Sequence, residues 1–539
     1  MRNLVVCCDG SWATIDLQQN GILCPTNVAR LYHAIDDGNK EAVLKYYHPG
    51  VGTEGGWWAR LRGGVVGAGL DKNIMSAYNW LAEHYKPQDN IFIFGFSRGA
   101  YTARSLVGMI SVCGLIDFST IGDDEDKRWK AVESIFKDYR KNKPSMRYHF
   151  IPGVRIRFLG VWDTVGALGI PDNYVILSLL FNRARRYKFH NTNLSTIIDY
   201  ARHAVALDEK RASFTPTLWT PLIPFGCDVK QTWFPGGHGD VGGGCLERGL
   251  SDAALLWMIK EAESEKLKLP FKQDMKKQLK PDYKGASHDA VTGIAGVIMR
   301  TQPRSCPYIA ENYSKSNLLN LIDDSVIDRK KDPPVILGEY FSSKVLAVGD
   351  KKEVVVYAGE HWSKTDIYLE KGGIYNFAAK GKWIIGGRLK CTPDNNRAPC
   401  DKASGFQKRN TERINLIRAI KDGVFWPRMY KLFFTRFILG FVLSIFEKLL
   451  RIIFWDKEMD FPFTKRIEHI PWLKLTGTVA NAGEPNPNGT PAVPETFGIG
   501  NELLNYQCKE SGYLYCFIND AWDFYNTHQG SLRLTVNRV

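Results

Sequence analysis

Short apolar runs alternate with amphipathic segments along the first part of the chain. The runs have the length of strands, whereas the segments between them repeat apolar positions with a helical period. In chain order, strands are predicted at 3–8, 42–48 and 90–96, and helices at 26–35, 70–85 and 99–110. Strands that alternate with helices in this way form a parallel sheet covered on both faces. The pattern therefore predicts an α/β fold.

Two further apolar strands are predicted at 155–163 and 229–234. The alternation is interrupted between them, at 172–228, where the first part of the segment is amphipathic. Two interpretations stand equally: a cap-like insertion over the site, or an extra helical layer. The α/β domain with this insertion is assigned to residues 1–300.

The pattern changes near residue 300. Residues 301–345 are rich in turn-forming residues and are interpreted as a linker. Beyond them, the segments at 352–362, 372–383 and 530–536 alternate apolar and polar residues as antiparallel strands do. An all-β sandwich is therefore expected at 346–539, interrupted by an insertion at 391–500.

The insertion contains an apolar run at 429–455. On a helix, most of its polar residues would gather into one narrow strip, and the apolar arc would be wider than that of an ordinary surface helix. Its charge-free part, 437–446, falls short of the roughly 20 apolar residues needed to span a bilayer. A helix buried between the domains and an interfacial helix lying in a lipid surface both remain open.

Composition narrows the class of protein. The 539 residues are 44% hydrophobic and 24% charged, which is typical of a globular protein. The net charge of +14 favours anionic partners, and because no nucleic-acid motif accompanies it, a membrane surface is preferred. Eleven cysteines without framework spacing do not indicate a disulfide scaffold. The chain opens on a strand without signal-peptide architecture, which predicts synthesis in the cytoplasm and export, if any, by a signal-independent machine.

The stretch GFSRG, at 95–99, fits the nucleophile elbow G-x-S-x-G. An apolar strand precedes it and a helix of small residues follows, which is the context that the motif requires. Side chains at Gly95 and Gly99 would collide with neighbouring backbone in such a turn. Ser97 is therefore predicted to be a nucleophile rather than a residue in a structural turn.

A nucleophilic serine needs a base and a carboxylate that orients the base. His238 is the candidate base, because it lies in a glycine-rich loop directly after a strand. Asp163 is the favoured acid, at the end of an earlier strand. Asp240 competes with it, but residues two apart rarely form a linear Ser-His-Asp arrangement.

The oxyanion requires backbone N–H groups. One is expected from Arg98, the residue after the nucleophile, and a second from the loop at Gly10 and Ser11. Asp9 is interpreted as a residue that fixes this loop by accepting hydrogen bonds, in preference to a metal ligand. No metal site and no cofactor are expected.

Eight segments of the N-terminal part occur in order: NLVVCCDGSW, PTNVARLYHAI, YHPGVGT, GLDKNIMSAYNWL, GFSRGAYTARSLVGMI, GVWDTVGALGIP, ALDEKRASFTPTLW and WFPGGHGDVGGG. Together they resemble the α/β-hydrolase family that includes phospholipase effectors of the bacterial type VI secretion system. The resemblance covers roughly residues 1–300. It implies a triad of Ser97, Asp163 and His238, phospholipid acyl esters as substrates, and a secretion-apparatus or immunity protein as partner.

The C-terminal strands resemble the β-sandwich of the calcium-dependent galactose-binding bacterial lectin. Asp520 is kept, but Thr527 and His528 stand where that lectin has two asparagines. Calcium prefers six to eight oxygen ligands, so an imidazole in place of an amide removes one. We expect no complete calcium or sugar site, and a module that docks on a partner or on lipid.

Two hypotheses of different classes follow. The first is a serine esterase of the phospholipase A type, an antibacterial effector that associates with the membrane of its target. The second is a glycan- or membrane-binding protein on a catalytically weak hydrolase scaffold. Serine, acid and histidine candidates in the expected chain order favour the enzyme.

Overall fold

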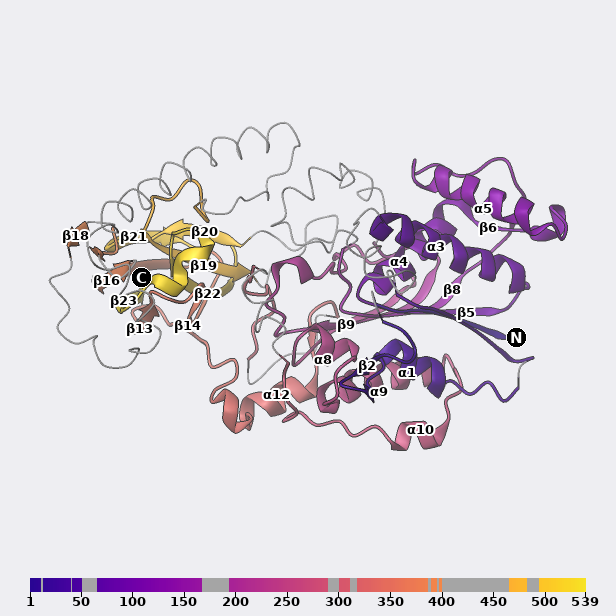
Figure 1. Ribbon diagram of the computed structural model, residues 1–539, viewed down its shortest axis with the longest axis horizontal. Coiled ribbons are helices and arrows are strands. Elements are labelled where there is room, and N and C mark those ends of the chain that lie inside the picture. The colour runs from indigo at the N-terminus through magenta and orange to yellow at the C-terminus, as the bar shows by residue number, and fades with distance from the viewer. Residues whose placement is uncertain are drawn as a thin grey trace, which may run out of the picture.

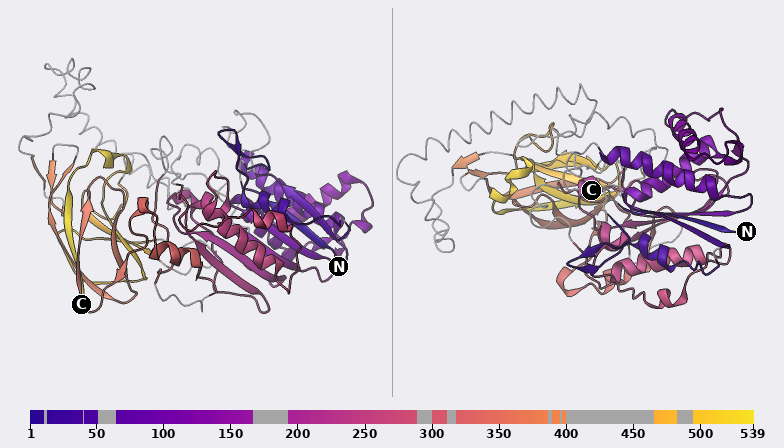
Figure 2. Two further views of the ribbon diagram at one scale, coloured as in Figure 1. Left: turned by 90° about the horizontal axis from the view of Figure 1, so that it is seen from below. Right: turned by 45° about the vertical axis from the view of Figure 1, so that its right-hand side comes forward.

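The computed structural model describes the chain except for residues 11–12, 40, 51–64, 167–192, 289–299, 311–317, 386–388, 395–396, 400–464 and 482–493. The described residues form an α/β part and a β-sandwich that lie next to each other along the longest axis (Figure 1). The N-terminus lies in the α/β part, at the end far from the sandwich, and the C-terminus lies in the sandwich (Figure 2).

A seven-stranded sheet forms the centre of the α/β part, in the order β11-β10-β9-β8-β5-β1-β4. In chain order its strands are β1 (Asn3–Cys8), β4 (Val43–His48), β5 (Asn90–Phe96), β8 (Ile156–Trp162), β9 (Ile198–Ala206), β10 (Asp228–Phe234) and β11 (Leu321–Ile322). All neighbouring strands are parallel. The predicted α/β fold is confirmed.

Helices cover both faces of this sheet, as Figure 1 shows. One face carries α3 (Val65–His84), α4 (Arg98–Cys113) and α5 (Glu125–Tyr139), and the other carries α1 (Asn27–Ala34) and α9 (Gly249–Glu263). The alternation within β1 explains the two layers: Leu4 and Val6 belong to the first core, whereas Val5 and Cys7 belong to the second.

Strand β9 lies inside the segment that was expected to be a cap-like insertion, 172–228. It occupies a central place in the sheet, between β8 and β10. The sequence pattern does not reveal this strand, because the polar residues Arg202 and His203 interrupt its apolar run and yet are buried. Arg202 pairs with Glu261, and His203 contacts Gln231, so both polar side chains are compensated inside the fold.

The sheet also continues past residue 300. Strand β11 pairs with β10 and lies in the segment interpreted as a linker, 301–345. The same segment contains α12 (Asp324–Lys331) and contributes Cys306 and Ile309 to a buried cluster. This cluster also holds Trp233 of the central sheet and Tyr513 of the sandwich. The segment is thus packed between the two parts of the molecule.

Two sheets enclose the core of the sandwich, with the strand orders β12-β14-β22-β19-β20 and β13-β23-β15-β21. Their strands are β12 (Lys344–Val345), β13 (Lys351–Tyr357), β14 (Ser363–Leu369), β15 (Ile374–Gly381), β19 (Leu475–Asn481), β20 (Glu495–Gly498), β21 (Glu502–Gln507), β22 (Gly512–Ile518) and β23 (Ser531–Arg538). The neighbours are antiparallel except for β12 and β14. An α/β hydrolase fold followed by a β-sandwich is therefore the architecture of the chain.

Strand β19 corrects the expected insertion at 391–500, because it is a central strand of the larger sheet. Its pattern is weak: Thr476 and Thr478 are buried, and Gly477 has no side chain. A Cβ at Gly477 would lie 2.7 Å from the ring of Phe497, so this ring packs closely against the strand at the glycine.

The apolar run at 429–455 lies outside the described residues. Among the helices that the structure describes, none is long and apolar enough to cross a membrane. Both interpretations of the run remain predictions.

Candidate active site

Ser97 stands in a sharp turn between β5 and α4. Its backbone has φ 58° and ψ −123°, a region that residues with a side chain rarely adopt. A Cβ at Gly95 would lie 2.5 Å from the carbonyl oxygen of Gly99, and one at Gly99 would lie 2.2 Å from that of Cys8. Both glycines are thus required by close backbone contacts, as the motif predicts.

His238 and Asp163 meet although they are far apart in the sequence. His238 begins the short helix α8 (His238–Gly242), just after β10, and Asp163 directly follows β8. Nδ1 of His238 lies 2.6 Å from Oδ2 of Asp163. Asp163 is fully buried and has φ 32°, so its backbone is also held in the left-handed region.

The elbow lies beside this pair. The backbone N–H of Ser97 donates to the carbonyl oxygen of Trp162, the residue before Asp163, over 3.1 Å. The ring centroid of His238 lies 4.5 Å from that of Phe96 and 4.9 Å from that of Phe214, whose ring packs edge-on. Because β5, β8 and β10 are parallel, their carboxyl ends place all three predicted residues at one edge of the sheet.

Arg304 is a residue of this site that the sequence did not indicate. Its guanidinium donates from Nη1 to Oδ1 of Asp163 over 2.9 Å and from Nη2 to Oδ2 over 3.2 Å. Further hydrogen bonds to the carbonyl oxygens of Ala206 and Phe214 fix its position. No motif surrounds Arg304, which follows Pro303 in the segment at 301–345 that the sequence predicts to be a linker.

The electrostatics of Asp163 depend on Arg304. Burial by itself would raise the pKa of the Asp163 carboxyl, but the charge of Arg304 and the hydrogen bond with His238 outweigh burial and lower it to about 2. Asp163 is therefore a carboxylate near neutral pH, and it can stabilise a charged imidazole.

Glu209 supports the backbone of the histidine. Its Oε2 accepts a hydrogen bond from the His238 N–H over 3.2 Å, and Arg211 binds both oxygens of Glu209. A small hollow opens beside these groups, lined by Glu209, Arg211, Thr215, Pro216, Gln302, Pro303, Arg304 and Ser305.

The loop after β1 approaches the elbow as expected for an oxyanion hole. A Cβ at Gly10 would lie 3.4 Å from the Cβ of Ser97, so the Gly10 backbone comes close to the serine. Arg98 is the first residue of α4, and Ser11 lies outside the described residues. Whether Gly10, Ser11 and Arg98 donate to an oxyanion stays a prediction.

Asp9 fixes this loop through several hydrogen bonds. Its carboxylate accepts from the N–H of Gly10 and from the hydroxyls of Thr26 and Tyr47, over 2.6 to 2.7 Å. Burial raises the pKa of Asp9 to about 6, against the lowering effect of these donors. The arrangement agrees with the structural role given to Asp9.

Asp240, the competing acid, faces a different histidine. Its Oδ1 lies 2.6 Å from Nδ1 of His288, and its Oδ2 accepts from the backbone N–H groups of Gly237 and His288. The geometry therefore gives Asp163 to His238 and Asp240 to His288. Among the described residues, one group is arranged so that it could hold a metal ion: Asp240, Cys245 and His288, with ligand atoms within 4.8 Å of one another.

In the sandwich, the imidazole of His528 contacts the carboxylate of Asp520. Nε2 of His528 lies 2.9 Å from Oδ2 of Asp520, while Oδ1 of Asp520 accepts from the N–H of Ala521. The Thr527 hydroxyl donates to the carbonyl oxygen of Phe524. The side chains of Thr527 and His528 are thus engaged within the protein, and the incomplete calcium site stays a prediction.

The parallel sheet with helices on both faces defines the class of fold as that of the α/β hydrolases. More specifically, residues 2–261 match the family model described as T6SS, phospholipase effector Tle1-like, catalytic domain. The resemblance predicted from the eight segments is thereby confirmed for this region.

Relatives of known sequence or structure share parts of the chain. The Saccharomyces cerevisiae protein YEL023C is 29% identical in an alignment of 244 residues that covers 41% of this chain and 33% of that protein. The crystal structure of a Pseudomonas aeruginosa protein shares 18% sequence identity with this chain. Its TM-score is 0.32, and the match covers 52% of this chain and 49% of that protein's chain. The Tle1 effector bound to the VgrG spike is 18% identical, with a TM-score of 0.27 over 44% of this chain and 50% of its own. The chain thus spans half or less of the length of each of these three proteins.

Proposed function

We propose that the protein is a serine hydrolase that cleaves acyl esters of phospholipids, as a lipase effector of a type VI secretion system. The observation that carries this proposal is the contact of 2.6 Å between Asp163 and His238 at the sheet edge where Ser97 stands in a strained turn. The match of residues 2–261 to the Tle1-like catalytic family supports the substrate class.

The proposed mechanism follows from the hydrogen bonds of His238. When Nδ1–H donates to Asp163, Nε2 has a free lone pair and takes the proton of the Ser97 hydroxyl as its oxygen attacks the ester carbonyl. The carboxylate of Asp163 stabilises the imidazolium that forms. The imidazolium then gives its proton to the leaving alcohol, and water releases the acyl group from Ser97 by the same steps.

The developing oxyanion requires donors at the elbow. In this proposal the N–H of Arg98 is one donor, and the Gly10–Ser11 loop supplies the other. The start of α4 at Arg98 supports the first assignment, because the N-terminus of a helix favours negative charge.

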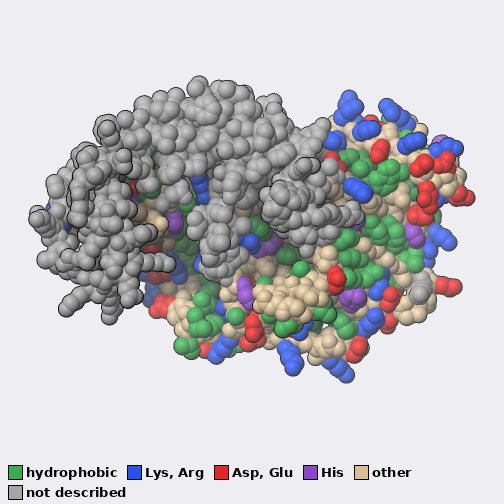
Figure 3. All heavy atoms as spheres, viewed as in Figure 1, with side chains coloured by type: hydrophobic (Ala, Val, Ile, Leu, Met, Phe, Trp, Pro, Cys, Tyr) green, Lys and Arg blue, Asp and Glu red, His purple; other side chains and the backbone are tan. Residues whose placement is uncertain are grey.

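Substrate position and partners form the finer part of the proposal. We infer a phospholipase of the A type that works at a phospholipid membrane surface, with a secretion-apparatus or immunity protein as partner. The formal net charge of +14 supports an anionic surface. On the face shown in Figure 3, the basic and acidic side chains of the described residues are mixed, so this face shows no single basic patch.

An active-site probe tests the proposal. A fluorophosphonate should label the native protein at Ser97, and Ser97→Ala should lose both labelling and ester cleavage while remaining folded. Ser111→Ala is a matched control, because Ser111 stands exposed on the same helix. Mass spectrometry of lipid extracts after incubation identifies the bond that is cleaved. A folded protein that takes up no label would favour the glycan- or membrane-binding alternative.

A further inference from the structure

A second histidine-carboxylate pair lies close to the proposed triad. Asp240 is the third residue of α8, the helix that His238 begins, and it contacts His288 rather than His238. The side chain of Asp240 is 1% exposed, whereas that of His288 is 35% exposed. The proposed mechanism uses neither residue, although a buried carboxylate facing a half-exposed imidazole is a common donor set for metal ions.

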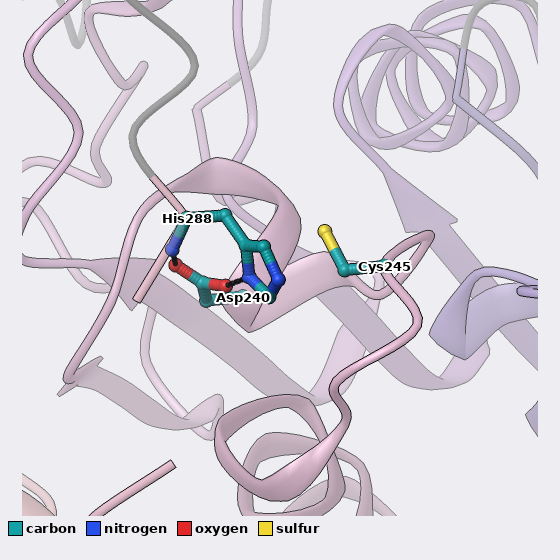
Figure 4. Close-up of side chains that lie close together, drawn as sticks. All are labelled: Asp240, Cys245 and His288. Atoms are coloured by element: carbon teal, nitrogen blue, oxygen red, sulfur yellow. Dashed lines mark hydrogen bonds and ion pairs between the residues drawn. The ribbon is translucent and has the colours of Figure 1, made fainter. Parts of the chain in front are cut away.

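Cys245 completes the donor set. Gly243 and Gly244 follow α8 with φ of 81° and 100°, and this left-handed turn brings the chain back toward the helix. A Cβ at Gly239 would lie 3.1 Å from Sγ of Cys245, so the sulfur rests against the first turn of α8 where no side chain intervenes. Figure 4 shows the ring of His288 between Asp240 and Cys245.

We propose that Asp240, Cys245 and His288 bind one divalent transition-metal ion of the zinc class. Each offers one ligand atom, and these atoms lie within 4.8 Å of one another. A carboxylate, a thiolate and a neutral imidazole together carry two negative charges, which neutralise a divalent ion. Mixed oxygen, nitrogen and sulfur ligation suits zinc, with a fourth position left for water.

The Asp240–His288 pair needs only a small change to hold a zinc ion. Two ligand atoms at about 2.0 Å from a tetrahedral zinc lie roughly 3.3 Å apart, so the Asp240–His288 pair has to open only a little from its 2.6 Å contact. The metal then takes the place of the proton between Oδ1 and Nδ1. Oδ2 of Asp240 can keep its bonds to the N–H groups of Gly237 and His288, which hold the carboxylate in place.

Metal binding would tie α8 to the chain at 287–288. Ser287 already contacts Asp240 through its hydroxyl, over 3.3 Å. Because His238 begins the same helix, the ion would stabilise the element that carries the proposed catalytic base. The proposal does not rest on esterase activity, and a protein without activity could still bind the metal.

Zinc retention by the full chain tests the site. The reduced, metal-free protein is mixed with zinc, dialysed and analysed by mass spectrometry for metal content, and we expect one zinc per chain. Cys245→Ser and His288→Gln should each lower zinc affinity at least tenfold. Cys227→Ser is the matched control, because Cys227 is half-buried like Cys245 but does not belong to the cluster. Circular dichroism checks that each variant is folded.

Cobalt gives a second readout that identifies the ligands. The cobalt-loaded wild type should show a thiolate-to-metal charge-transfer band that Cys245→Ser loses and Cys227→Ser keeps. The proposal is overturned if the wild type retains no zinc, if both ligand variants retain it as tightly as the wild type, or if the cobalt spectrum has no thiolate band.

Discussion

At the scale of single residues, the proposed triad depends on how one buried carboxylate is compensated. Asp163 has no exposed surface, and an ion in such a place is strongly destabilising unless donors surround it. His238, Arg304 and the N–H of Ala206 supply these donors. The acid of the site is therefore built by three separate parts of the chain, and one of them stands beyond residue 300.

The two aspartates near His238 can be ranked by substitution. Asp163→Asn should lower turnover by about three to four orders of magnitude, because an amide cannot hold the histidine in the required tautomer. Asp240→Asn should lower the melting temperature but keep most of the turnover, because Asp240 contacts His288. The measurement is kcat per folded enzyme on a short-chain ester, and the opposite ranking would reverse the assignment of the two acids.

Removing Arg304 should destabilise the protein, because the buried carboxylate of Asp163 loses its cation. Arg304→Gln leaves Asp163 buried without its cation, and breaking such a pair costs about 3–5 kcal/mol of unfolding free energy. The stability that the ionised Asp163 contributes also depends on pH. With the pKa of Asp163 lowered to about 2, the wild type gains stability above the unfolded value near 4 and loses it as pH falls toward 2.

In Arg304→Gln the raising effect of burial is no longer opposed by the arginine, so the acid-unfolding midpoint should move to higher pH. Denaturant melts between pH 2 and 7 measure both effects. Arg300→Gln provides a comparison with a less buried arginine four residues earlier in the chain. An unchanged acid midpoint in Arg304→Gln would show that the arginine does not set the charge state of Asp163.

The sequence indicated Ser97, Asp163 and His238 because each directly follows a strand or stands in a glycine-rich turn, where few residue types are tolerated. It could not indicate Arg304, because an arginine in irregular chain carries no periodic or motif signal. The pairing of Asp240 with His288 was also hidden, since residues 48 apart meet only through the fold.

At the scale of elements, strands with a continuous apolar run were predicted from the sequence. A strand whose apolar run is interrupted by buried, hydrogen-bonded polar residues was not. β1 and β5 are continuous apolar runs and were expected within a residue of their observed bounds. β9 was missed because Arg202 and His203 interrupt its apolar pattern. Burial lowers the pKa of His203 to about 3, with Arg104 adding to the effect, so the ring is neutral and can lie inside the sheet.

The 3-10 helix η4 (Trp522–Thr527) and the residue after it determine what the sandwich can bind. The imidazole of His528 lies 2.9 Å from Oδ2 of Asp520, so this oxygen already has a hydrogen-bond partner. The imidazole N–H that faces the carboxylate would also repel a cation. Added calcium should therefore leave the melting temperature unchanged, whereas a calcium site at 100 times its dissociation constant would add about 2.7 kcal/mol. Differential scanning fluorimetry with a calcium titration checks this, and a saturable upward shift would contradict it.

At the scale of the whole molecule, the segment at 301–310 connects the two parts of the chain to the proposed site. Arg304 contacts Asp163, and five residues later the N–H of Ile309 donates to the hydroxyl of Tyr513 in the sandwich over 2.9 Å. The indole N–H of Trp362 donates to the carbonyl oxygen of Thr301 over 2.9 Å. The sandwich therefore holds both ends of the segment that carries the arginine.

This arrangement predicts that a change within the sandwich affects catalysis. Tyr513→Phe removes the hydroxyl that accepts from Ile309 and donates to the carbonyl oxygen of Pro307, so a buried N–H loses its partner at a cost of about 1–3 kcal/mol. We expect a lower melting temperature and, because the segment also carries Arg304, a lower kcat on a soluble ester. Tyr357→Phe is the matched control, since Tyr357 is 52% exposed on β13. If Tyr513→Phe melts earlier but keeps the wild-type kcat, the sandwich stabilises the chain without positioning the site.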